Sequence, residues 1–101
     1  MIALGGVTQS LVQLDTVRFK LDRGRSELQA EVAGRCGEGK DHTVEVQLEL
    51  LDASGQTVAW LKGKGGIEEG DRGTIKTKVK LSSDQLARIT QFRLSFQARP
   101  D

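Results

Sequence analysis

The sequence contains a single cysteine, Cys36, and a single histidine, His42, a few residues apart. An imidazole can take the proton of a nearby thiol, and the thiolate is the reactive form in cysteine enzymes and redox sensors. Arg35 and Lys40 flank the pair and would favour the thiolate. However, the chain has no Asn to orient the imidazole and no Tyr to act as an acid. We expect Cys36 to be an unreactive loop thiol, with a thiol-dependent redox or enzymatic role as the alternative.

The sequence indicates neither a metal site nor a nucleotide site. One His and one Cys make half of a zinc site, and the carboxylates are scattered along the chain. Residues 34–40 match the first part of a phosphate-binding loop, Gly, four residues, then Gly-Lys. Asp41 stands where that motif needs a hydroxyl, and a strand rather than a helix is expected next. We predict no metal, no cofactor, and a flexible loop over 34–41.

Trp60 and a row of lysines are the remaining candidate binding residues. Trp60 lies in an expected strand, where a large aromatic side chain usually fills the core. The alternatives are an exposed binding anchor or the wall of a cleft for a small ligand. Lys76, Lys78 and Lys80 occupy alternate positions and would form a solvated strand face that also blocks edge-to-edge pairing. Contact with a polyanion is the alternative for this row.

Length and composition limit the class of protein. The 101 residues are enough for one domain, which we place at 1–101. Lys and Arg number 15 against 14 Asp and Glu, and this near-neutral balance argues against a nucleic-acid partner. With 37% hydrophobic residues the chain can fold without inserting into a membrane. A single cysteine excludes an internal disulfide, so burial must supply the stability.

The first residues carry no targeting signal that we recognise. Residues 1–6 lack the basic region and the long apolar region of a signal peptide. We expect residues 1–9 to be disordered or a tail, and the compartment stays unknown from this segment.

Apolar residues at every second position predict antiparallel strands with one solvated face. The clearest strand covers 42–51, where valines and leucines alternate with Glu45, Gln47 and Glu49. A turn at 52–55 and a returning strand over 56–62 complete a hairpin. Similar alternation predicts strands at 17–21, 27–32, 75–81 and 92–97. The glycine-rich stretch 63–73 is expected to be a loop that crosses between two sheets.

The charged residues of these strands are sorted by sign. In the first expected hairpin, Arg18 and Lys20 lie opposite Glu27 and Glu31, an arrangement that gives cross-strand pairs. Glutamates occupy 45–49 and lysines 76–80. We expect these two rows either to meet across a sheet or to present opposite potentials to a partner.

One short helical turn interrupts the strands near residues 83–88. Ser82 followed by Gln85 has the spacing of a capping box, and Leu86 and Ile89 could face the core together. No helical pattern is long enough for a parallel crossover. We therefore predict an all-β fold, an immunoglobulin-like antiparallel β-sandwich of about six to seven strands.

Residues 44–96 resemble the FxLYD domains, which are bacterial immunoglobulin-like modules. The motif that names the family is a strand ending in Phe, any residue, Leu-Tyr-Asp, and it stands here as Leu48-Glu49-Leu50-Leu51-Asp52, with Leu at both aromatic positions. Residues 67–71 resemble the loop that follows, with Glu69 in place of Pro, and residues 91–94 resemble the last strand. The resemblance implies a non-catalytic module, commonly outside the cytoplasm.

These observations together predict a non-catalytic interaction or structural module. It would act through a sheet face or an edge strand in protein-protein assembly, with a protein partner or a second copy of itself.

Overall fold

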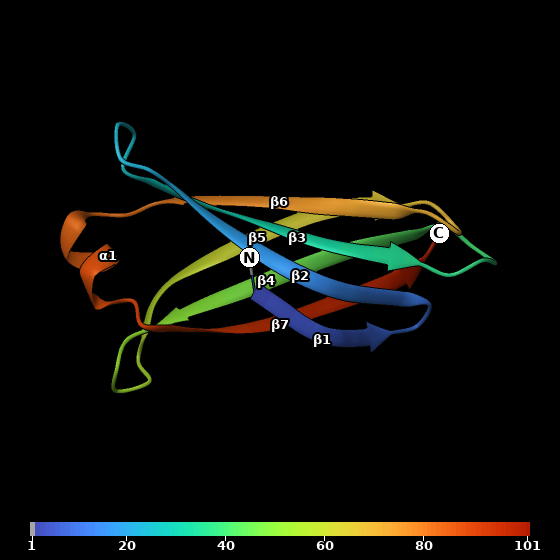
Figure 1. Ribbon diagram of the computed structural model, residues 1–101, viewed down its shortest axis with the longest axis horizontal. Coiled ribbons are helices and arrows are strands. Elements are labelled where there is room, and N and C mark those ends of the chain that lie inside the picture. Colours follow the sequence, from blue (N-terminus) through green and yellow to red (C-terminus); the bar gives the residue numbers. More distant parts are fainter. Residues whose placement is uncertain (1) are drawn as a thin grey trace.

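The computed structural model describes residues 2–101, without the side chains of residues 5–7. Seven strands and one helix follow one another along the chain (Figure 1). Their order and bounds are β1 (Ile2–Gln9), β2 (Val12–Asp22), β3 (Glu27–Cys36), β4 (His42–Leu51), β5 (Thr57–Ile67), β6 (Arg72–Lys80), α1 (Ser83–Arg88) and β7 (Gln91–Pro100).

The strands form two antiparallel sheets that lie one behind the other in Figure 1. The first sheet has the order β1-β2-β3-β6 and the second the order β5-β4-β7. The prediction of an all-β antiparallel sandwich with six to seven strands is confirmed. The predicted helical turn is also confirmed, because α1 covers 83–88.

The core fills the space between the two sheets and follows the period-two pattern of the sequence. In β4 the valines and leucines at alternate positions from 44 to 50 are at most 1% exposed, while Glu45, Gln47 and Glu49 lie on the outer face. Burial of alternate residues is what a strand with one wet face requires. The buried core residues are Val12, Leu14, Val17, Ala30, Val32, Cys36, Val44, Val46, Leu48, Leu50, Leu61, Ile67, Ile75 and Leu81.

Local hydrogen bonds fix the predicted turn and the helix. Asp52 accepts hydrogen bonds from the Ser54 hydroxyl at 2.7 Å and from the Gln56 amide at 2.9 Å, and these bonds hold the pKa of Asp52 below its ordinary value. At α1, the Ser82 hydroxyl accepts from the Gln85 amide and the Gln85 side chain accepts from the Ser82 amide. This is the capping box that the spacing predicted.

The prediction of a disordered segment or tail at 1–9 is wrong for residues 2–9, which form β1; residue 1 lies outside the described residues. Strand β1 pairs with β2, from Ile2 opposite Val17 to Gln9 opposite Val12. A register shift between Ala3 and Val7 interrupts the alternation of apolar and polar residues, so the sequence of this strand does not show a period of two. The turn at Ser10 adopts a φ of 55° without a glycine, asparagine or aspartate, so it lacks the residues that most often mark such a turn.

The predicted loop over 63–73 is also wrong in most of its length. Strand β5 continues to Ile67 and β6 begins at Arg72, so only 68–71 form a turn. Glycines are depleted in strands and therefore suggested a loop. Here Gly63 occupies a strand position that another backbone approaches closely, which is a known use of glycine in a strand. Likewise β3 continues to Cys36, which shortens the predicted loop at 34–41 to residues 37–41.

The charged rows do not meet across one sheet. The glutamates of β4 belong to the second sheet and the lysines of β6 to the first. In the first hairpin the predicted pair of Arg18 opposite Glu31 is confirmed. The other predicted pair is wrong, because Lys20 stands opposite Gln29 and Glu27 stands opposite Asp22. Further carboxylates gather in the turns at 37–41 and 68–71, which touch through the bond from the Glu69 amide to Asp41 at 2.9 Å. These turns carry Glu38, Asp41, Glu68, Glu69 and Asp71.

Candidate functional site

The two long sides of the sandwich differ in how tightly they close. On one side, β5 of the second sheet packs against β6 of the first. A Cβ placed on Gly63 would lie 2.6 Å from Thr77 Cγ2 and 2.7 Å from the Lys76 carbonyl oxygen. A Cβ on Gly65 would lie 2.7 Å from Ile75 Cδ1. The Lys76 carbonyl oxygen leaves no room for a side chain at position 63, and a side chain at position 65 would require the end of the Ile75 side chain to move. These glycines therefore allow the two sheets to close on this side.

The other side of the sandwich is open along β7, the last strand of its sheet. Strand β7 pairs only with β4 among the described residues. The Ala98 amide donates to the Gln9 side chain, so this amide points away from β4. Since alternate amides of a strand point to opposite sides, the amides of Phe92, Leu94 and Phe96 point the same way. No strand within residues 2–101 pairs with them.

The inward-facing side chains of β7 are only partly covered. Phe92, Leu94, Phe96 and Ala98 are half-buried, in contrast to the fully buried residues of the neighbouring strand β4. Phe92 meets Phe19 of β2 edge-on, with ring centroids 5.2 Å apart and planes at 68°. This contact bridges the two sheets across the open side. We call residues 91–98, with their outward amides and half-buried inner row, the β7 edge.

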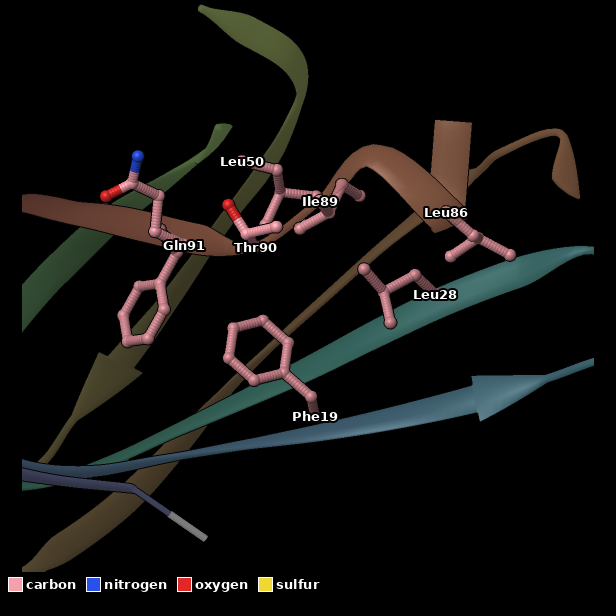
Figure 2. Close-up of a pocket in the computed structure, with 8 residues that line it drawn as sticks. Phe19, Leu28, Leu50, Leu86, Ile89, Thr90 and Gln91 are labelled. Atoms are coloured by element: carbon pink, nitrogen blue, oxygen red, sulfur yellow. The ribbon is translucent and has the colours of Figure 1, made fainter. Parts of the chain in front are cut away.

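An apolar cleft of about 290 Å³ adjoins the β7 edge where the strand begins. Figure 2 shows Phe19 and Leu28 of the first sheet on one side of the cleft and Leu50, Ile89 and Leu86 on the other. The capping box fixes the start of α1 and thereby places Leu86 at the cleft. On the first sheet, β1 reaches only to Val17, and no described strand continues along β2 beyond that point.

The outer face of β7 is basic. Arg93 lies 3.6 Å from Glu49, and Arg99 lies 2.6 Å from Glu45, both on β4. Glu45 is also 3.7 Å from Lys64 of β5. The arginine side chains remain 72% and 62% exposed, so their guanidinium groups have unused donors that face solvent.

Sequence reasoning identified the strand 92–97 but did not identify it as a functional candidate. Edge position depends on which strands pair, and pairing over long sequence separations is not visible in local periodicity. One signal was present: Phe92, Leu94 and Phe96 place two of the three phenylalanines in one strand.

Cys36 and His42 are brought together, as their chemistry required, but both are buried. Cys36 Sγ lies 3.3 Å from His42 Nδ1, and the thiol donates to the Lys40 carbonyl oxygen at 3.4 Å. The other ring nitrogen, Nε2, lies 3.0 Å from the Ser10 hydroxyl. Cys36 is 4% exposed and His42 is 1% exposed. The imidazole thus ties the β1-β2 turn to the loop at 37–41.

Burial opposes thiolate formation at Cys36. It raises the pKa of the thiol above its ordinary value, and the negative charges of Asp41 and Glu69 raise it further. Arg35, expected to favour the thiolate, forms an ion pair with Asp15 instead, at 3.6 Å. These surroundings support the unreactive thiol over a redox centre.

We therefore expect iodoacetamide to alkylate Cys36 with a pH midpoint above about 8.5, the value for an ordinary thiol. The Cys36 thiol of the unfolded chain loses its proton at a lower pH than the thiol of the folded protein. The contribution of the protonated thiol to the free energy of unfolding is therefore complete below the ordinary pKa and is lost as the pH rises through the raised pKa of the folded protein. Mass spectrometry of alkylated protein at a series of pH values measures the midpoint, and Cys36→Ala should lose this part of the alkaline destabilisation. A midpoint below 8.5 would revive the redox alternative.

The prediction that Trp60 fills the core is wrong. Its side chain is 42% exposed on the outer face of β5, while its neighbour Leu61 is fully buried. Lys62 Nζ lies 5.5 Å from the indole ring centroid, within range of a cation-π contact. Trp60 does not line either of two cavities on this face, one formed by residues 45–47 and 62–64 and the other by Glu45, Gln47 and residues 95–97.

Lys76, Lys78 and Lys80 are exposed on the outer face of β6. In the β3-β6 register they stand opposite Glu31, Gln29 and Glu27 respectively. They therefore form part of a mixed-charge face on the last strand of the first sheet, a position where lysines discourage pairing with other chains.

Within the described part of the chain, no three His, Cys, Asp or Glu side chains gather where they could hold a metal ion. No helix over residues 2–101 has the length and apolar character needed to cross a membrane.

Comparisons with known proteins identify a fold but no family. No protein-family model matches the chain. No curated protein matches it. The chain is similar to the crystal structure of cj0090 from Campylobacter jejuni, with 23% sequence identity and a TM-score of 0.50 over 97% of this chain and 96% of that one. At this identity the likeness shows the fold alone.

Proposed function

We propose that this protein is a non-catalytic interaction module that binds an extended segment of a partner protein along the β7 edge. One observation carries the proposal: β7 presents outward amides and a half-buried apolar row to which no described strand adds. Strand addition at an exposed sheet edge is an established mode of peptide recognition. Main-chain hydrogen bonds between the two strands would provide affinity, and the half-buried apolar side chains of β7 would fix the register of the added segment.

The contrast with the other edges supports this proposal. Edge strands are usually protected against pairing by lysines, prolines, bulges or a covering element. Strand β6 has its lysine row, β5 is closed against β6, and β1 has an irregular register. Only the end of the β7 edge is covered, where the Ala98 amide meets Gln9. Within residues 2–101 no strand covers the amides of Phe92, Leu94 and Phe96, and the charges on the outer face of β7 are arginines rather than a lysine row.

The strand order supports an immunoglobulin-like reading of this sandwich. In that fold, strands A, B and E share one sheet, and the other sheet continues from C to F to G. Here β2, β3 and β6 would be A, B and E, while β4 and β7 would be C and F. No described strand takes the place of G beside β7. The resemblance to FxLYD modules points the same way, toward a non-catalytic role.

Site-specific photo-cross-linking tests the proposal. A benzophenone amino acid at Ser95, on the β7 edge, should give a covalent adduct in cells that make the protein. The same group at Lys78, on the outer face of β6, is the matched control and should give none. Both positions are exposed on strands at the end of a sheet.

A second variant shows whether the adduct depends on strand addition. Leu94→Pro removes an amide that points away from β4, so the β4-β7 ladder is retained. Circular dichroism should show a folded protein, and the Ser95 adduct should disappear. Adducts from Lys78 alone would place the interaction on a sheet face, and no adduct from either position would contradict the proposal.

A further inference from the structure

Charge alternates from strand to strand across the outer face of each sheet. In the first sheet, Arg18, Glu31 and Lys76 stand side by side in register on β2, β3 and β6. In the second sheet, β5 presents Lys62 and Lys64, β4 presents Glu45 and Glu49, and β7 presents Arg93 and Arg99. Opposite charges on adjacent strands stabilise a sheet and like charges weaken it. A strand added beyond β7 would continue the alternation if it were acidic.

The cations around the carboxylates of β4 outnumber those carboxylates. Glu45 is shared between Lys64 and Arg99, and Glu49 is paired with Arg93. Two carboxylates thus face four cations on this sheet. Both arginines are on β7, Arg93 within the β7 edge and Arg99 just beyond it, and their exposed guanidinium groups can donate to a further carboxylate.

An added strand must carry acidic residues toward the arginines, and the half-buried inner side chains of β7 set a second requirement. A residue opposite Phe92, Leu94 or Phe96 would point to the same side as these half-buried side chains. Apolar residues at these positions would cover the inner row, and at one end they would approach the apolar cleft beside α1. The added strand therefore needs apolar residues at alternate positions.

Strand β4 already meets both requirements on the other side of β7. Its residues 43–50, Thr-Val-Glu-Val-Gln-Leu-Glu-Leu, alternate apolar and polar positions. Its two glutamates are four residues apart, one opposite Arg93 and the other opposite Gln97 with Arg99 in reach. The chain thus contains a template for the kind of strand that fits beside β7.

We propose that the β7 edge selects an acidic amphipathic segment of a partner protein, with apolar residues at alternate positions and two carboxylates four residues apart. This inference rests on the proposed function and adds the chemistry of the partner. A second copy of β7 does not meet the requirement, because its outer face carries only Arg, Gln and Ser next to Arg93 and Arg99. Self-pairing would leave both arginines without a new carboxylate.

Two synthetic peptides provide the probe. The first has the sequence of residues 43–50, and the second has lysine in place of both glutamates; each carries a fluorescent label on a soluble linker. Fluorescence anisotropy at low salt should show the acidic peptide binding about tenfold more tightly, because two exposed ion pairs are exchanged for like-charge contacts. The difference should shrink as salt is added.

Protein variants locate the effect. Neutralising both arginines, Arg93→Gln with Arg99→Gln, should remove the preference for the acidic peptide, and the matched variant Lys62→Gln with Lys64→Gln on β5 should retain it. Leu94→Pro should abolish binding of either peptide. No binding of the acidic peptide at millimolar concentration would overturn the inference.

The outcomes separate this inference from the proposed function. Equal binding of the two peptides, abolished by Leu94→Pro, would overturn the acidic preference and leave strand addition at β7 intact. Binding of the acidic peptide that Leu94→Pro does not affect would overturn both, because the site would lie elsewhere.

Discussion

Gly63→Ala should lower the free energy of unfolding by about 2 to 3 kcal/mol, although it adds only a methyl group. The new Cβ would lie 2.6 Å from Thr77 Cγ2 and 2.7 Å from the Lys76 carbonyl oxygen, and the backbone oxygen cannot move without shifting β6. Urea unfolding followed by circular dichroism measures the loss.

Gly66→Ala is the matched control in the same strand. Its Cβ would meet its nearest neighbour, the His42 carbonyl oxygen, at 3.8 Å, which is an ordinary contact. We expect no change or a gain of about 0.5 kcal/mol from the lower entropy of the unfolded chain. Equal midpoints for the two variants would contradict the tight closure of the sandwich between β5 and β6.

Leu61→Ala should destabilise the protein far more than Trp60→Ala, although tryptophan is the larger residue. Leu61 is fully buried between the sheets, and such a truncation costs about 2 to 5 kcal/mol. Trp60 is 42% exposed, and its contact with Lys62 is worth about 0.5 to 1 kcal/mol at an exposed site.

The same pair of residues allows a spectroscopic check. Acrylamide should quench Trp60 fluorescence efficiently in the folded protein, because part of the indole is in water. Strong protection from quenching, together with a larger stability loss for Trp60→Ala than for Leu61→Ala, would show that the orientation of β5 is reversed.

Local periodicity predicted most of the fold because the strands have one wet face. The alternation in β4, the turn at Asp52 and the capping box at Ser82 each involve residues close in sequence. The errors occurred where a distant backbone determines the residue. Gly63 pairs with Val46 of β4, and the residue there is a glycine because β6 lies against it. Neither contact can be inferred from the residues next to Gly63 in the sequence.

Trp60 was misplaced for a related reason. Side chains at 60 and 61 point to opposite faces, so only one of them can enter the core. Size favoured Trp60, but the register with β4 sets Leu61 opposite the buried Leu48 and Trp60 opposite Glu49. When either face of a strand could be buried, the pairing with the neighbouring strand thus determines which side chains enter the core.

The candidate site was the least accessible to sequence reasoning. A strand lies at an edge when no other strand pairs with one of its sides, and this depends on the rest of the chain. The sequence of β7 itself has the alternating pattern of any half-buried strand. The Cys36-His42 pair was visible because its residue types are distinctive, yet burial determines its chemistry.

The carboxylates gathered in the turns at 37–41 and 68–71 give this nearly neutral molecule a long-axis electric dipole. The outer faces of both sheets carry an excess of cations, while these turns lie together at one end of the sandwich (Figure 1). An acidic segment approaching in solution is repelled from that end and attracted to the sheet faces. The field of the whole molecule would therefore steer the acidic segment proposed above toward the first half of β7, where the outward amides and the apolar cleft lie.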